Sequence, residues 1–198
     1  MQKSGVTAEF VYNADGLRVQ KTVNGVATKY TLHGKNIVHM TSGTDELHFF
    51  YDAQNKPAVV IFNGIAYAYL YDLQGDVIGL VDNNGTQMVS YTYDAWGKML
   101  SKTGTLASTL GTIQPFRYRG YALDEETELY YNQSRFYNPS IARFITADTT
   151  GVLTASLKSL TEKNLFAYCD NNPVMRKDID GAFWDTFFDI VSLCLLYT

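Results

Sequence analysis

The chain is poor in charged residues, cysteine, histidine and proline. Charged residues make up 18% of its 198 residues, and it has two cysteines, three histidines and four prolines. Cys169 and Cys194 lack the spacing of metal ligands, so the sequence predicts neither a disulfide framework nor a zinc site. A net charge of −4 without clustered lysine and arginine argues against a nucleic-acid partner.

The three histidines, His33, His39 and His48, fall in predicted strands and turns with no carboxylate or cysteine cluster beside them. We therefore interpret them as partly exposed strand or turn residues and not as metal ligands. Nothing in the sequence indicates a metal, a nucleotide or a redox group, so no cofactor is expected.

Long hydrophobic segments are also missing. The first ten residues contain no apolar run of signal-peptide length, so an export signal would lie upstream in a longer parent chain. The apolar tail 183–198 places Asp185 and Asp189 on one face if it is helical. It is shorter than the roughly 20 residues that a helix needs to span a bilayer. We expect a terminal helix there and no transmembrane span.

Tyrosine, phenylalanine and glycine are abundant instead, with 15, 11 and 15 residues. Aromatic residues favour strands, and glycine supplies the positive φ that tight turns need. The composition therefore predicts a mainly β fold.

A tyrosine followed by Asp or Asn and then by a turn recurs through the first hundred residues. An Asp side chain in this place can accept hydrogen bonds from the backbone ahead of it, and a following glycine accepts left-handed geometry. The motif returns about every 20 residues, which indicates an internal repeat. The copies are Tyr12-Asn13, Tyr51-Asp52, Tyr71-Asp72 and Tyr93-Asp94, with a degenerate copy at Tyr30.

Short turn signals mark the opposite ends of the predicted hairpins. They lie at Asn24-Gly25, Ser42-Gly43, Asn63-Gly64 and 82–85, and Asn-Gly between strand-like runs is a strong hairpin signal. Such an antiparallel meander cannot bury both faces alone, so it must stack or curl. Its first strand is an open sheet edge unless more repeats precede it. Strands are predicted at 17–23, 26–32, 36–41, 46–51, 58–62, 65–71, 76–81 and 86–93.

The Tyr-Asp-x-x-Gly turns at this period resemble the YD repeats of Rhs proteins, the Tc-toxin C component and teneurins. In those families the ribbon spirals into a large hollow shell. After residue 100 the ordered motifs from Pro115 to Gly181 resemble the Rhs repeat-associated core module. The predicted organisation is a YD-repeat β-ribbon at 1–100, a connecting loop at 101–114, a mixed, loop-rich core module at 115–182 and the tail at 183–198, which resembles the start of a pre-toxin helical segment.

Three places depart from the family pattern. Glu128 stands where the family usually has Gly, and Ala142 replaces the Gly of an Asp-Pro-x-x-Gly motif. We interpret both as loosened turn constraints. The terminal motif 178–181 lacks its usual Pro and is followed by Ala182 in place of Leu.

Four arginines of the core segment alternate with Tyr and Phe in a region rich in acidic residues. An arginine can stack on a ring while its fork meets a carboxylate. We interpret these residues as structural links within a crowded module: Arg117, Arg119, Arg135 and Arg143.

The resemblance also implies self-cleavage, which members of the family often perform just after the terminal motif to release an effector. Two close carboxylates cannot both ionise, so one acts as an acid while the other activates water. The matching residues are Asp148, Asp178 and Arg143, with Asp180 and Asp170 as weaker candidates, and cleavage would follow Ala182. The alternative is structural: Asp148 caps a helix, and Asp178 and Asp180 are turn residues.

Three functions stay open from the sequence. The first is a structural shell or plug of a toxin carrier, whose partners would be an upstream YD-repeat shell, a C-terminal toxin and an immunity protein. The second is a single-turnover aspartyl autoprotease that acts on its own chain. The third is an extracellular ribbon that binds carbohydrate or mediates adhesion through exposed tyrosines. All three place the chain in a secreted or cell-surface protein.

Overall fold

A computed structural model describes residues 2–3, 5–147, 164–178 and 184–186. Its largest element is an antiparallel sheet of eleven strands in which every strand pairs with its neighbour in sequence. The strands are β1 (Gln2–Lys3), β2 (Val6–Tyr12), β3 (Arg18–Val23), β4 (Val26–His33), β5 (Asn36–Ser42), β6 (Asp45–Tyr51), β7 (Pro57–Phe62), β8 (Ile65–Tyr71), β9 (Val77–Val81), β10 (Gln87–Tyr93) and β11 (Met99–Thr103).

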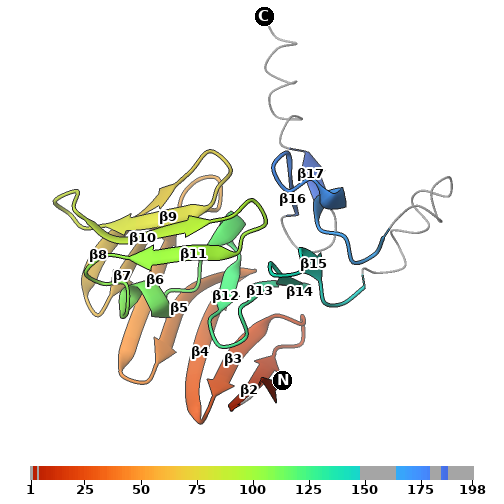
Figure 1. Cartoon of the computed structure of the whole chain (residues 1–198). Helices are drawn as coiled ribbons and strands as arrows, with labels where there is room; N and C mark the ends of the chain where they lie inside the picture. The colour runs from red at the N-terminus through yellow and green to blue at the C-terminus, as the bar shows by residue number, and fades with distance from the viewer. Residues whose placement is uncertain (1, 4, 148–163, 179–183, 187–198) are drawn as a thin grey trace, which may run out of the picture.

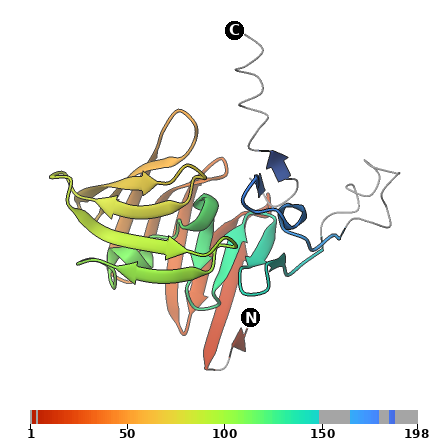
Figure 2. The same cartoon turned by 45° about the horizontal axis from the view of Figure 1, so that its top comes forward.

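The structure confirms the predicted β-hairpin meander. The strands β3 to β10 coincide with the eight predicted strands to within one residue at each end. The sheet curves strongly, so that its early strands β3–β5 lie at an angle to its late strands β9–β11 (Figures 1 and 2). By curving, the sheet partly encloses one of its own faces.

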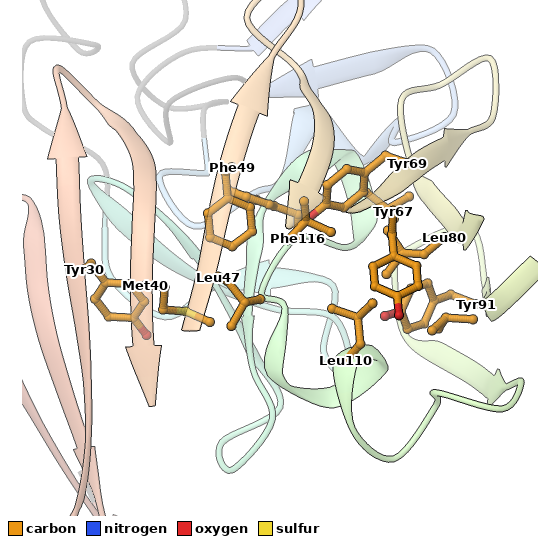
Figure 3. Close-up of a cluster of buried hydrophobic side chains, with 13 residues drawn as sticks. Tyr30, Met40, Leu47, Phe49, Tyr67, Tyr69, Leu80, Tyr91, Leu110 and Phe116 are labelled. Atoms are coloured by element: carbon orange, nitrogen blue, oxygen red, sulfur yellow. The ribbon is translucent and has the colours of Figure 1, made fainter. Parts of the chain in front are cut away.

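The first hydrophobic core lies on one face of the curved sheet. Alternate residues of the strands, such as Leu47 and Phe49, turn their side chains to this face and are almost fully buried. The chain beyond β11 returns across the same face and contributes Leu110 and Phe116 (Figure 3). The ring of Phe116 contacts Phe49 edge-on at 5.3 Å between centroids. The ribbon is therefore closed on this side by its own continuation.

Five turns of the sheet share one hydrogen-bonding pattern. In each, the side-chain oxygen of an Asn or Asp accepts hydrogen bonds of 2.8 to 3.0 Å from the backbone N–H groups two and four residues later. This local bonding fixes where each strand ends and the next begins. The residues are Asn13, Asp52, Asp72, Asp82 and Asp94.

Three of the tyrosines that precede these turns link the two strands of one hairpin. Their hydroxyls donate to backbone carbonyls at the start of the preceding, paired strand: Tyr51 to Ile37 at 2.8 Å, Tyr71 to Pro57 at 2.5 Å and Tyr93 to Val77 at 2.8 Å. The ring fills the space between strands while the hydroxyl satisfies a main-chain acceptor. Phenylalanine could do only the first of these.

The segment 101–114 is more regular than the predicted connecting loop. Residues 101–103 continue β11, and the hydroxyls of Thr92 and Ser101 pair across the strands at 2.7 Å. A short helix, α1 (Leu110–Ile113), follows. Small polar residues resemble a loop in composition, but here pairing with β10 supplies the backbone hydrogen bonds that make a strand.

A second sheet forms the centre of the core module. It consists of β12 (Ala122–Asp124), β13 (Leu129–Asn132), β14 (Arg135–Asn138) and β15 (Arg143–Phe144) in sequential antiparallel order. Its buried face carries aromatic residues, including Tyr130, Tyr137 and Phe144, which pack with Tyr168. Two 3-10 turns, η1 (Tyr118–Gly120) and η2 (Cys169–Asn171), flank this cluster.

The start of the tail corrects the prediction of a helix. Residues Trp184–Thr186 form strand β17, which pairs antiparallel with β16 (Arg176–Asp178). A spacing of apolar residues that suits a helix also suits a short strand when a partner strand supplies backbone hydrogen bonds. The predicted helix over the remaining residues of the tail lies outside the described part of the chain. Within that part, no helix is long and apolar enough to cross a membrane.

The turns at Glu128 and Ala142 are not loosened, which corrects a second prediction. Their φ angles are +59° and +55°, the left-handed conformation that the glycines of the family pattern would adopt readily. The turn geometry therefore persists after the glycine is replaced, because pairing of β12 with β13 and of β14 with β15 holds the backbone on both sides. Non-glycine residues in this conformation carry a cost of about 1–2 kcal/mol each.

Candidate functional site

Buried polar side chains gather where the core module meets the sheet, and Arg117 lies at the centre of this junction. Its side chain is completely buried, and its guanidinium lies 4.3 Å from the centre of the Tyr91 ring. It donates hydrogen bonds to the backbone carbonyls of Gln114 at 2.6 Å, Phe116 at 2.9 Å and Gly111 at 2.5 Å. One cation thus satisfies three main-chain carbonyls of the segment that covers the sheet.

Gln114 extends the same network. It is fully buried, and its amide group bonds the hydroxyls of Tyr69 at 3.1 Å and Tyr91 at 3.0 Å. It also bonds both backbone groups of Phe116 at 3.0 Å. Gln114 was not a predicted site residue, because a single glutamine at the end of a polar segment carries no signal of burial.

Arg119 joins three segments that are far apart in the sequence. Its backbone N–H donates to Asp76 Oδ1 at 2.7 Å, and its guanidinium donates to the carbonyls of Gln74 at 2.9 Å and Pro173 at 2.5 Å. Burial raises the pKa of Asp76 to about 6, although the positive charge of Arg119 opposes that shift. Asp76 was not a predicted site residue.

Arg18 forms an equivalent link at the other end of the sheet. Its Nη1 lies 2.6 Å from Asp124 Oδ2, and both side chains are almost fully buried. Lys21 reaches the other oxygen of the same carboxylate at 3.1 Å. The guanidinium of Arg18 also lies over the ring of Tyr131 at 4.4 Å. These contacts fasten β3 to the core module, and the sequence did not predict them because the partners are about a hundred residues apart.

Asp178 is the predicted catalytic residue whose surroundings are best described. It is buried, with Oδ2 3.0 Å from Arg135 Nη2, and the Arg135 guanidinium lies 3.6 Å from the centre of the Phe144 ring. Asn132 Nδ2 donates to the backbone carbonyl of Asp178 at 3.0 Å, and the Tyr121 hydroxyl donates to the same oxygen. A cation at this distance stabilises the carboxylate anion. The Asp178 side chain is therefore held inside the core module by a buried ion pair.

The other predicted catalytic residues are placed differently. Arg143 is exposed in β15 and forms a backbone bridge to Ala167, whereas Arg135 is the arginine that pairs with Asp178. Asp170 is exposed in η2 and pairs with Arg176 at 2.6 Å. Asp148, Asp180 and the expected cleavage position after Ala182 lie outside the described residues. The catalytic pairing of Asp148 with Asp178 thus stays a prediction.

The histidines require one correction. We expected no carboxylate beside them, but Glu46 Oε1 lies 2.9 Å from His39 Nε2 and 3.3 Å from His48 Nε2. The pairing of β5 with β6 brings His39 opposite His48, and Glu46 is two residues before His48 on the same face. The predicted turn at Ser42-Gly43 implies this register. The hairpin therefore creates a cluster that cannot be recognised from residues adjacent in the sequence.

Comparison with known proteins supports the repeat interpretation. Residues 36–174 match the family model described as the teneurin YD-shell. The chain is 36% identical over 178 residues to the tRNA3(Ser)-specific nuclease WapA of Bacillus spizizenii, covering 88% of this chain and 7% of that protein. It is 27% identical over 176 residues to the double-stranded DNA deaminase toxin A of Burkholderia cenocepacia, covering 74% of this chain and 12% of that protein.

The fold also resembles a solved structure, the Tc holotoxin pore of Photorhabdus luminescens. The TM-score is 0.66 at 19% identity, and the likeness covers 91% of this chain and 9% of that chain. The chain therefore spans a small part of each of these relatives. The eleven-stranded meander, its repeated Asx turns and the family match over most of its length establish that this chain belongs to the YD-repeat shell family, of which teneurins and Rhs proteins are members.

Proposed function

We propose that this chain forms the closing end of a YD-repeat shell that encloses a polypeptide effector in a longer exported protein. In this proposal residues 1–100 form part of the shell wall, and residues 115–182 form a plug that closes the shell. The segment between them connects the wall to the plug. Two relatives are named as a nuclease and as a deaminase toxin, and this chain matches only a small part of each of them. These names support a toxic effector that lies outside the matched part.

The observation that carries the proposal is the closure of the sheet by its own continuation. Arg117, Leu110 and Phe116 lie against the sheet, while Arg119 and Arg18 fasten the module at both ends of the sheet. Burying a charged side chain is costly unless it is hydrogen-bonded. A core module attached to the sheet by its chain connection alone would not need buried cations at each junction. These buried links suit a module that must stay closed over the sheet.

The experiment begins with the native protein in the cells that produce it. An antibody against the core segment should detect a polypeptide far larger than this 198-residue chain. Its carboxy-terminal part should resist protease in the native state and be digested after denaturation. A native protein no larger than this chain, or a carboxy-terminal part that is digested as fast as an unfolded peptide, would contradict the proposal.

A second proposal is self-cleavage after Ala182, and the buried pairing of Asp178 with Arg135 supports it. Asp178 would act as the base that activates water, and Asp148 would supply the acid. A tethered cleavage site needs little substrate binding because the chain itself keeps the bond near the carboxylates.

The test is the intact mass of the purified chain after long incubation. We expect a fragment ending at Ala182 in the wild type, no cleavage in Asp148→Asn, and normal cleavage in Asp170→Asn, whose carboxylate is exposed. An unchanged mass of the wild type would rule out self-cleavage by this chain and would leave the shell proposal standing.

A further inference from the structure

The hairpin of β5 and β6 carries a cluster of metal-ligating side chains on the face opposite the hydrophobic core. His39 pairs with His48 across the two strands, and Thr41 pairs with Glu46. Side chains alternate along a strand, so His48 and Glu46 point away from the buried Leu47 and Phe49. The cluster therefore lies outside the junction described above, and neither shell closure nor self-cleavage uses it.

The three donor atoms converge on one point. Glu46 Oε1 lies 2.9 Å from His39 Nε2 and 3.3 Å from His48 Nε2, and all three lie within 4.8 Å of one another. A zinc ion with ligand bonds of about 2.0–2.1 Å in tetrahedral geometry holds its donors roughly 3.3–3.5 Å apart. Only small side-chain movements separate this arrangement from a metal-bound one.

The local structure fixes the cluster in place. The two imidazole rings stack with centroids 4.6 Å apart. The backbone N–H of Glu46 donates to Asn63 Oδ1 at 2.9 Å, and Asn63 Nδ2 donates to Asp45 Oδ1 at 2.8 Å, so the start of β6 is held on the side away from β5. The ligand-bearing strands are thus ordered before any ion binds, which lowers the entropic cost of binding.

The exposure of the cluster suits an ion that binds from solution. The side chains of His39, His48 and Glu46 are 28%, 47% and 55% exposed. Three protein ligands leave a fourth tetrahedral position for water. Two imidazoles with one carboxylate favour zinc, copper or nickel over magnesium or calcium, which prefer an all-oxygen shell.

We propose that His39, Glu46 and His48 form a binding site for one divalent transition-metal ion, with zinc as the reference ion. A bound ion would join β5 to β6 on the solvent face, in addition to their backbone hydrogen bonds. It would stabilise the hairpin without taking part in the chemistry of the core module.

Zinc chloride is titrated calorimetrically into the untagged full chain after treatment with a chelator. We expect one ion per chain. His39→Asn, Glu46→Gln and His48→Asn should each weaken zinc binding at least tenfold, because loss of a direct ligand costs more than the 10- to 100-fold that loss of an outer hydrogen bond costs. His33→Asn is the matched control, since His33 lies at the exposed end of β4 and should bind zinc like the wild type.

Proton NMR of the imidazole rings locates the ion independently. Saturating zinc should shift the ring resonances of His39 and His48 and leave those of His33 unchanged. The three ligands are at least partly exposed, so the variants should unfold at nearly the wild-type temperature without metal, which separates loss of binding from loss of folding. Absence of binding at millimolar zinc, or equal weakening in His33→Asn and His48→Asn, would overturn the proposal.

Discussion

The hydroxyl of Tyr93, at the end of β10, donates a hydrogen bond of 2.8 Å to the backbone carbonyl of Val77, at the start of the paired strand β9. Tyr51 and Tyr71 make the same bond to Ile37 and Pro57. The tyrosine of each of these turns therefore does more than end a strand. It ties the two strands of its hairpin together at their open end, which gives a physical reason for tyrosine at this place in the repeat.

Removal of these hydroxyls should destabilise the sheet. Tyr51→Phe and Tyr93→Phe should each lower the free energy of unfolding by about 1 kcal/mol, because each leaves a part-buried carbonyl without its donor. Urea denaturation measures the change. Tyr12→Phe is the control, since the Tyr12 side chain is 41% exposed and its loss should stay within about 0.5 kcal/mol. Equal losses at all three positions would contradict the bridging role.

Arg117 should be among the residues whose replacement costs most. Arg117→Met removes the donor from the carbonyls of Gln114, Phe116 and Gly111, so we expect a loss of about 3 kcal/mol or more. Arg176→Met is the matched control: its ion pair with Asp170 is partly exposed, and such pairs contribute up to about 1 kcal/mol. If thermal and urea unfolding show equal effects for the two variants, Arg117 does not hold the covering segment.

The left-handed turn at Ala142 offers a stabilising substitution. Ala142→Gly removes a conformational cost of about 1–2 kcal/mol from the folded state. It also raises the entropy of the unfolded chain, which lowers stability by about 0.4–1 kcal/mol. A net gain of roughly 0.5 kcal/mol in the free energy of unfolding is expected. Ala68→Gly in β8 is the contrasting control and should destabilise by about 0.5–1 kcal/mol. A loss of stability in Ala142→Gly would show that the turn carries no strain.

Asp76 should give the stability a measurable pH dependence. Burial raises the pKa of its carboxyl from 3.8 to about 6 in the folded chain, so the folded state binds the proton more tightly than the unfolded state does. The stability that the protonated Asp76 carboxyl contributes is fully present below about pH 4. It is lost as the pH rises through 6, by an amount on the order of 2–3 kcal/mol.

The comparison of wild type with Asp76→Asn isolates this effect. The difference between their free energies of unfolding should change between pH 4 and pH 6 and stay constant from pH 7 to 8. Parallel curves across the whole range would show that Asp76 titrates in the folded chain as it does when unfolded.

Local chemistry explains why so much of the fold could be predicted from the sequence. The bonding of Asp52, Asp72 and Asp94 to the backbone involves residues within four positions, and Asn24-Gly25 adopts its tight turn from its own conformational preferences. Each strand therefore begins and ends for reasons present in a short window. The same turns set the register between neighbouring strands, and that register already places His39 opposite His48.

Prediction was weaker where a residue's state depends on a distant partner. Residues 101–103 are a strand because β10 lies beside them, and 184–186 are a strand because β16 does. Their own composition favours a loop and a helix. The buried pairs Arg18–Asp124 and Arg119–Asp76 join segments that no short window contains.

The sequence by itself determined the hairpin repeat, the place of every turn from Tyr12 to Tyr93 and membership of the family, because those features depend on neighbouring residues. The tertiary structure alone decided which arginine meets which carboxylate, notably that Arg135 and not Arg143 pairs with Asp178. A buried charge is stable only with a partner at hydrogen-bond distance, and that distance is set when the core module folds back onto the curved sheet.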